Sequence, residues 1–262
     1  MSGTGDAPGA RRVPAATWPD ALWLLRHGES AGNRARDEAE ADGRAVIDLA
    51  DRDMDVPLSD LGRRQAQAAG RWIGEMDPRQ QPTVVFVSPY VRAMQTADLV
   101  IEAGGLGHLP RLTDERLRER EFGILDGLTI RGIRERFPEE ADRRARLGKF
   151  YHRPPGGESW ADVVKRVRDV TAELGRDHPG ERVLVVAHEV VVLLFRYVLE
   201  RLGEQDVLAL GRAEEIANCS LSRFEFDVDA GRLLRRTWNE TSPLADEGEV
   251  VTSEPDVAAG PR

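Results

Sequence analysis

Residues 21–30, ALWLLRHGES, begin with five apolar residues and end in a group of polar ones. The apolar part does not alternate with polar residues, and a short continuous run of this kind is typical of a strand covered on both faces. Two further runs have the same character, residues 83–87 (TVVFV) and residues 182–187 (RVLVVA). Three such strands predict a sheet that lies inside the protein between layers of helices.

Helical patterns separate these runs. Ser59 is a candidate N-cap for a helix that begins at Asp60 and ends near Met76. Residues 220–227 (SLSRFEFD) alternate between apolar and polar and predict another strand, nearer an edge of the sheet. Strands that alternate with helices predict an α/β fold, here a three-layer α/β/α sandwich with a mostly parallel central sheet. Further helices are expected between Pro89 and Gly104, from Glu158 to near Asp177, and from Val190 to Leu202.

The chain is predicted to form one domain with two tails. Residues 20–240 contain no internal repeat and no linker. Residues 1–19 are rich in glycine, alanine and proline, and residues 241–262 have a similar composition. Such segments bury too little apolar surface to order themselves, so both are expected to be disordered.

Composition excludes several classes of partner. The net charge of −9 argues against nucleic acid. The longest apolar stretch, residues 183–199, is interrupted by His188, Glu189 and Arg196, so no membrane span is expected. Cys219 is the only cysteine, which fits a reducing compartment. Because residues 1–19 also lack the apolar run of a signal peptide, a cytoplasmic location is expected.

Two histidines directly follow predicted buried strands, His27 after the first and His188 after the third. Ligands of open parallel sheets bind outside the carboxyl ends of the strands, so these two side chains are expected to share a pocket. Arg26 offers a planar set of donors that matches phosphate oxygens, and Gly28 permits a tight turn. A neutral imidazole nitrogen can attack phosphorus and form a phosphoramidate that water then hydrolyses. The alternative is a surface histidine in a strand-to-helix loop.

Several motifs occur in a fixed order, and together the set resembles the histidine phosphatase superfamily, also called the phosphoglycerate mutase-like family. The resemblance covers residues 21–240. The motifs are LLRHGES at 24–30 followed by Asn33, VPLSDLGRRQA at 56–66, SPYVRAMQTA at 88–97, LREREFG at 117–123, GGES at 156–159 and VLVVAH at 183–188.

This resemblance implies a role for six residues. His27 matches the phosphorylated histidine, His188 the second histidine and Glu119 the proton donor, while Arg26, Arg92 and Asn33 match phosphate-binding residues. Positive charge from the arginines and His188 stabilises a transferring phosphoryl group, so no metal and no cofactor are expected. A departing alkoxide needs a proton, and a nearby phosphate anion favours the acid form of a carboxyl group that can give it. Glu121 lies in the same charged run, and the choice of Glu119 rests on the motif alignment.

The sequence departs from the family pattern at two places. Glu189 follows the second histidine where the family commonly has glycine, and its carboxylate must turn away or repel an anionic substrate. Residues 34–55 form a longer insert than expected, with eight acidic residues and four arginines. The insert is either a lid over the pocket or a solvated loop, and we favour the loop.

Residues 128–155 are shorter than the segment that mutases of the family carry, and this favours hydrolysis over phosphoryl transfer back to the substrate. The predicted function is a metal-independent phosphomonoesterase that hydrolyses a small phosphorylated metabolite through a phosphohistidine. The alternatives are a bisphosphoglycerate-dependent phosphoglycerate mutase and a non-catalytic binding protein on the same fold. The substrate and the oligomeric state stay open.

Overall fold

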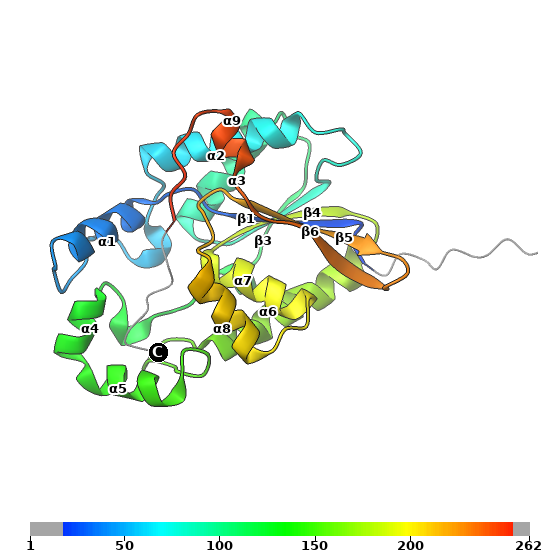
Figure 1. Ribbon diagram of the computed structural model, residues 1–262. Helices are drawn as coiled ribbons and strands as arrows, with labels where there is room; N and C mark the ends of the chain where they lie inside the picture. The colour runs from blue at the N-terminus through cyan, green and yellow to red at the C-terminus, as the bar shows by residue number, and fades with distance from the viewer. Residues whose placement is uncertain (1–17, 254–262) are drawn as a thin grey trace, which may run out of the picture.

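A six-stranded sheet runs through the middle of the protein, which a computed structural model describes over residues 18–253 (Figure 1). The strand order is β3-β2-β4-β1-β5-β6. Strands β3, β2, β4 and β1 are parallel to one another. At the other side of the sheet, β5 is antiparallel to β1, and β6 is antiparallel to β5. The prediction of an α/β fold with a mostly parallel sheet is therefore confirmed. The strands are β1 (Ala21–Arg26), β2 (Val84–Val87), β3 (Arg111–Thr113), β4 (Arg182–Ala187), β5 (Leu221–Asp227) and β6 (Arg232–Glu240).

Strand β1 explains why continuous apolar runs form the centre of the sheet. It lies between β4 and β5, and every one of its residues is buried. Leu22 and Leu24 pack into the hydrophobic cluster on one face, whereas Trp23 and Leu25 pack into the cluster on the other. Alternate residues thus enter two different cores, and a polar residue at any of these positions would lose its hydration without a partner.

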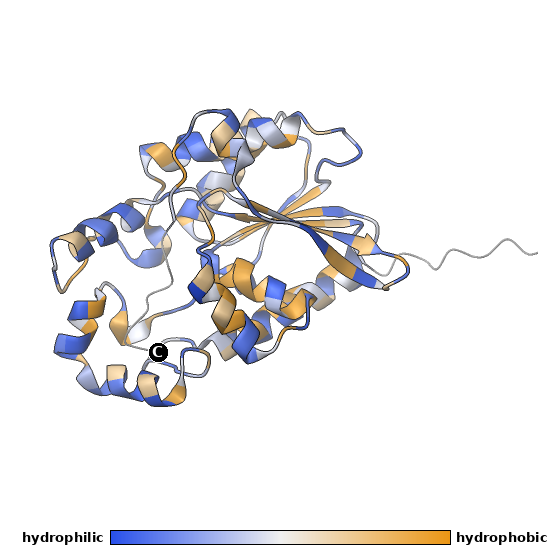
Figure 2. Cartoon of the chain, in the orientation of Figure 1, coloured by the Kyte–Doolittle hydropathy of each residue, from blue (hydrophilic) through white to orange (hydrophobic). Residues whose placement is uncertain are grey.

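Helices cover both faces of this sheet (Figure 1), and their apolar sides face it (Figure 2). Helix α2 begins as predicted after Ser59, whose hydroxyl accepts a hydrogen bond from the Gly62 N–H. Helix α6 begins at Trp160 because Ser159 caps it. One layer contains α2 (Asp60–Gly74), α3 (Val91–Ala103) and α9 (Ser242–Asp246), and the other contains α6 (Trp160–Asp177), α7 (Glu189–Leu199) and α8 (Glu204–Ala213).

A smaller group of helices lies where β1 leads into α1 (Figure 1). The group comprises α1 (Ala31–Ala41), α4 (Ile130–Arg136), α5 (Pro138–Leu147) and three 3₁₀ turns at Asp53–Asp55, Glu115–Leu117 and Gly123–Leu125. Within the insert, Ala39 and Ile47 are buried, and the Ile47 N–H donates to the Gly127 carbonyl at 2.9 Å. The preference for a solvated loop over residues 34–55 was therefore wrong, because apolar residues anchor the insert.

The C-terminal segment is ordered up to residue 253, so the predicted disorder from residue 241 was wrong for this part. Leu244 of α9 is fully buried, and the Gln65 amide donates to the Val250 carbonyl at 2.8 Å and to the Thr252 hydroxyl at 3.0 Å. These contacts offset the ordering entropy that the composition suggested would prevail. The predictions for residues 1–17 and 254–262 lie outside the described residues.

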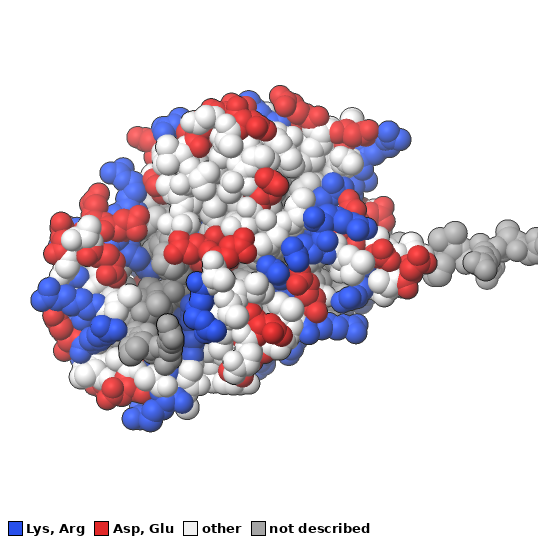
Figure 3. All heavy atoms as spheres, in the orientation of Figure 1, with Lys and Arg blue, Asp and Glu red and all other residues white. Residues whose placement is uncertain are grey.

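The surface is strongly charged, with acidic and basic side chains interspersed over the face shown in Figure 3. No helix within residues 18–253 has the length and apolar character needed to cross a membrane.

Candidate active site

The ends of three neighbouring strands build the centre of the site. His27 follows β1, Ser88 follows β2 and His188 follows β4, and these strands are adjacent in the order β2-β4-β1. The ring centroids of His27 and His188 are 5.1 Å apart. The structure thus brings together the two histidines that the strand-end argument placed in one pocket.

His27 is buried and oriented by its own turn. Its Nδ1 lies 2.7 Å from the Gly28 carbonyl, so Nδ1 carries the proton and donates to that oxygen. Nε2 is then the nitrogen with the lone pair, and it accepts from the Arg92 Nε–H at 3.3 Å. Burial, followed by the charges of Arg92 and Arg26, lowers the pKa of His27. The ring is therefore a neutral imidazole whose nucleophilic nitrogen faces an arginine.

The backbone around His27 is held from two sides. Glycine is required at position 28, because a Cβ there would lie 2.4 Å from the Gly62 carbonyl oxygen at the start of α2. The Asn218 side-chain amide donates to the His27 carbonyl at 3.0 Å, and the Asn218 N–H donates to the Thr252 carbonyl at 2.8 Å. The turn that carries the histidine is thus fixed by α2 and by the C-terminal segment.

His188 is fully buried, and Ser88 determines its tautomer. The Ser88 oxygen accepts from the Tyr90 N–H at 3.3 Å and lies 2.8 Å from His188 Nε2. Among the hydrogen bonds of the described residues, Nε2 is the one acceptor within reach of the Ser88 hydroxyl proton, so we assign that proton to the bond with Nε2 and the imidazole proton to Nδ1. Within residues 18–253, Nδ1 has no hydrogen-bond partner. Burial, then Arg92 and His27, lower the pKa of His188, so the ring presents one neutral, unpaired N–H donor.

Sequence reasoning overlooked Ser88, although it directly follows a predicted buried strand. The strand-end rule that selected the two histidines would have selected this serine as well.

The two arginines that match phosphate-binding residues of the family are both buried, and each has a partner. The Arg26 guanidinium donates to the Ile216 carbonyl. Arg92 pairs with Asp53 of the insert, with Nη1 3.0 Å from Oδ1 and Nη2 3.1 Å from Oδ2. Asp53 was not foreseen, because nothing in the sequence links residue 53 to residue 92. Its carboxylate contacts both terminal nitrogens of Arg92.

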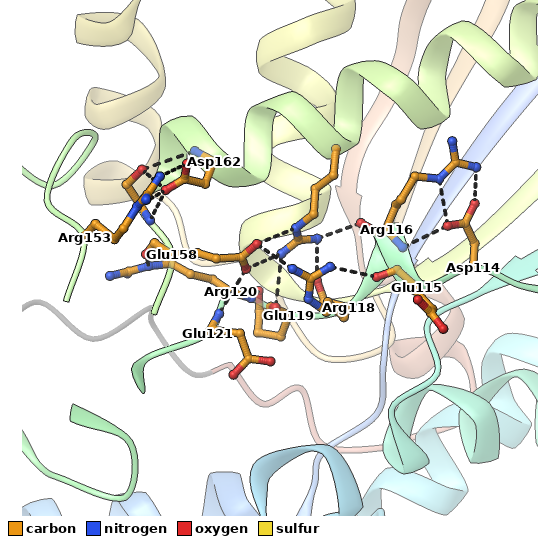
Figure 4. Close-up of polar contacts among 12 residues, drawn as sticks. Asp114, Glu115, Arg116, Arg118, Glu119, Arg120, Glu121, Arg153, Glu158 and Asp162 are labelled. Carbon is orange, nitrogen blue, oxygen red and sulfur yellow. Dashed lines mark hydrogen bonds and ion pairs between the residues drawn. The ribbon is translucent and has the colours of Figure 1, made fainter. Parts of the chain in front are cut away.

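Glu119 follows the 3₁₀ turn Glu115–Leu117, and a network centred on Glu158 holds its backbone (Figure 4). Glu158 binds Arg166 at 2.9 Å and Arg118 at 2.8 Å, and Arg166 donates to the Glu119 carbonyl at 3.1 Å. One Glu119 carboxylate oxygen accepts from the Arg120 N–H at 2.8 Å. The network therefore fixes the backbone of the loop that carries Glu119.

The structure separates Glu119 from Glu121. Glu119 lines the same pocket as His27 and Arg92. Glu121 is absent from that lining, and its carboxylate instead accepts a hydrogen bond from the Tyr90 hydroxyl at 3.0 Å. The geometry thus favours Glu119 for contact with a substrate.

Two further polar residues line this pocket. The Asn33 side-chain oxygen accepts from the Ser30 N–H at 2.7 Å and caps α1, which leaves the amide nitrogen as the group able to donate to a ligand. Glu189, the first residue of α7, is buried in the pocket wall. Its side chain therefore lies in the pocket wall and has not turned into solvent.

Taken together, five of the six predicted site residues line one pocket, and the sixth, His188, lies beside His27. A buried neutral imidazole with two guanidinium groups and a second imidazole defines an anion site of the kind found in enzymes that handle phosphate esters. The sequence profile of the histidine phosphatase superfamily (branch 1) matches residues 22–240, and the chain belongs to this superfamily.

Similar proteins include both mutases and phosphatases. The chain is 33% identical over 223 residues to a 2,3-bisphosphoglycerate-dependent phosphoglycerate mutase of Methylobacterium radiotolerans, covering 80% of this chain and 98% of the relative. It is 30% identical to phosphoglycerate mutase-like protein 4 of Arabidopsis thaliana, covering 86% and 87%. A mycobacterial glucosyl-3-phosphoglycerate phosphatase solved with VO3 has a TM-score of 0.62 at 30% identity, covering 85% of this chain and 100% of that structure.

Proposed function

We propose that the protein is a phosphomonoesterase that acts without a metal or cofactor and forms a phosphohistidine at His27. The observation that carries this proposal is the lone pair on His27 Nε2, which lies beside Arg92 and next to a second, neutral imidazole. Its substrate is a small phosphorylated metabolite, and we expect neither nucleic acid nor a membrane as a partner. We place the enzyme in the cytoplasm.

The proposed reaction has two steps. His27 Nε2 attacks phosphorus, the ester P–O bond breaks, and the leaving alkoxide takes a proton from the Glu119 carboxyl group. Water then attacks the phosphohistidine, gives its proton to the Glu119 carboxylate, and phosphate departs from the restored imidazole. Arg26, Arg92 and the His188 Nδ1–H stabilise the charge on the equatorial oxygens in both steps.

The test is turnover of para-nitrophenyl phosphate in the presence of EDTA. Wild-type protein is expected to hydrolyse it. When a reaction with ³²P-labelled substrate is quenched, the protein is also expected to retain a label that is acid-labile and base-stable. His27→Asn abolishes both signals, whereas the matched variant His108→Asn, in an exposed loop, retains them. Full turnover by the His27 variant would refute the mechanism.

The mutase is the second candidate, since a bisphosphoglycerate-dependent mutase is among the relatives. It predicts interconversion of phosphoglycerates that is stimulated by bisphosphoglycerate and exceeds the release of inorganic phosphate. Absence of both activities in a folded wild-type sample would instead support the non-catalytic binding protein.

A further inference from the structure

Carboxylates dominate the pocket wall that lies beyond the phosphate-binding residues. We define the floor as Arg26, His27, Arg92 and His188, and the acidic rim as Asp51, Asp53 and Asp126. The whole pocket contains five carboxylates, including Glu119 and Glu189, and three arginines, of which two belong to the floor. A leaving group that extends from the floor therefore meets mostly negative charge.

The rim is part of an ordered wall. It is contributed by the insert and by the segment after the 3₁₀ turn Gly123–Leu125, which are joined by the hydrogen bond from Ile47 to Gly127. An isolated β-bridge between Val46 and Leu128 adds a second link. Asp53 is fixed by its ion pair with Arg92. The carboxylates are thus held at the pocket by the fold.

The rim carboxylates act on one another. Burial and then the charge of Asp53 raise the pKa of Asp126, and Glu121 adds to this rise. Arg36, the third arginine of the pocket, opposes it with a smaller effect than Asp53. Any further anion placed beside Asp126 would meet the same repulsion.

Apolar side chains complete the wall between the carboxylates. Ile47 and Leu49 of the insert line the pocket, together with Phe122, which directly precedes the 3₁₀ turn Gly123–Leu125. This part of the wall suits the carbon skeleton of a leaving group, and the carboxylates suit its hydroxyl or amino groups.

On the basis of the proposed function, we infer that the substrate is a phosphomonoester whose leaving group is uncharged or cationic, and that Asp51 and Asp126 discriminate against esters with a second anionic group. Outside the floor, the pocket lining contains one arginine, Arg36, against the three carboxylates of the rim. A carboxylate or a second phosphate would therefore be desolvated in a region of net negative charge. The selection thus acts through repulsion.

Three probes of similar size separate the charges: phosphoethanolamine, glycerol 3-phosphate and 3-phosphoglycerate. In wild-type protein at pH 7.5, kcat/KM for 3-phosphoglycerate is expected to be at least about tenfold below that for glycerol 3-phosphate. Phosphoethanolamine is expected to equal or exceed glycerol 3-phosphate. Asp126→Asn and Asp51→Asn should each reduce the disadvantage of 3-phosphoglycerate by about threefold or more. The readout is the ratio of the kcat/KM values for glycerol 3-phosphate and 3-phosphoglycerate, measured in the same variant. A general loss of activity lowers both values and leaves this ratio unchanged.

The control is Glu38→Gln, which removes one carboxylate from the exposed side of α1, and it should leave the ratio unchanged. A second measurement does not depend on turnover: calorimetric affinities of His27→Asn for the same probes. Equal or tighter binding of 3-phosphoglycerate than of glycerol 3-phosphate would overturn the inference, even if the enzyme hydrolyses para-nitrophenyl phosphate through His27. The expected order of affinities without any hydrolysis by wild-type protein would support the inference and refute the proposed phosphatase.

Discussion

The floor and the acidic rim of the pocket differ in origin and in charge. The floor follows central strands of the sheet, combines two guanidinium groups with two neutral imidazoles, and is almost completely buried. The rim comes from short turns outside the sheet, carries carboxylates, and is more open, with the Asp53 side chain 39% exposed. The sheet thus fixes the groups proposed to bind phosphate, whereas inserted segments supply the carboxylates proposed to select the leaving group.

The largest effect expected in this comparison is at Glu119, where floor and rim meet. In Glu119→Gln, hydrolysis of glycerol 3-phosphate should slow by about 10²–10⁴-fold, because its alkoxide cannot leave without a proton. Para-nitrophenyl phosphate has a far better leaving group and should lose much less. Steady-state kinetics with both substrates measure the difference.

Glu121→Gln is the matched control, since Glu121 binds Tyr90 outside the pocket lining. Equal losses for the two substrates in the Glu119 variant would rule out a proton donor at this position.

Arg92 connects the two regions, because it contacts His27 of the floor and Asp53 of the rim. Arg92→Lys keeps the charge but loses the planar set of donors, so kcat/KM should fall by about 10²-fold. Arg63→Lys, at an exposed position of α2, should have no effect. Retention of activity in the Arg92 variant would show that charge alone suffices.

A substitution of Ser88 tests whether its hydrogen bond to His188 matters for the floor of the pocket. Ser88→Ala removes the hydroxyl that fixes the tautomer of His188, so kcat should fall by about tenfold with little change in KM. Ser220→Ala removes another buried hydroxyl, one without a partner in residues 18–253, and should change neither activity nor stability appreciably. A raised KM with a normal kcat in the Ser88→Ala variant would contradict the assigned tautomer of His188.

The smallest effect concerns stability and pH. Both floor histidines have a pKa below the unfolded value of 6.5, so below pH 6.5 the unfolded chain binds protons that the folded chain does not. The free energy of unfolding should therefore fall as pH decreases from 7.5 to 5.5, by at most about 1.4 kcal/mol for each histidine. Urea denaturation at several pH values measures this.

His27→Asn should remove one of the two contributions and flatten the pH dependence. An unchanged slope would mean that the pKa of His27 is the same in the folded and the unfolded protein.

The floor could be predicted from sequence, and the rim could not. His27 and His188 follow apolar runs that are visible locally, and parallel strands align their ends. Asp53 reaches Arg92 only because buried Ile47 anchors the insert, a contact that no local pattern encodes. Glu119 stood in an ambiguous charged run, and only the motif alignment selected it. Strand β6 was missed because its sequence, RLLRRTWNE, has no regular alternation.

The tail was misjudged for a related reason. Its composition is that of a disordered segment, but the burial of Leu244 and the hydrogen bonds from Gln65 to Val250 and Thr252 outweigh that composition.

The contacts of Asn218 link this C-terminal segment to the turn at His27. Thr252 forms hydrogen bonds with Asn218, and the Asn218 amide donates to the carbonyl of His27. Thr252 therefore supports the turn that carries the proposed nucleophile, although the two residues are far apart in the sequence. A protein truncated after Glu240, the boundary that composition alone suggests, would keep every side chain of the pocket lining. It would still lose the hydrogen bonds between Thr252 and Asn218. Residues 241–253 therefore belong in any shortened form of the protein that is meant to keep this turn in place.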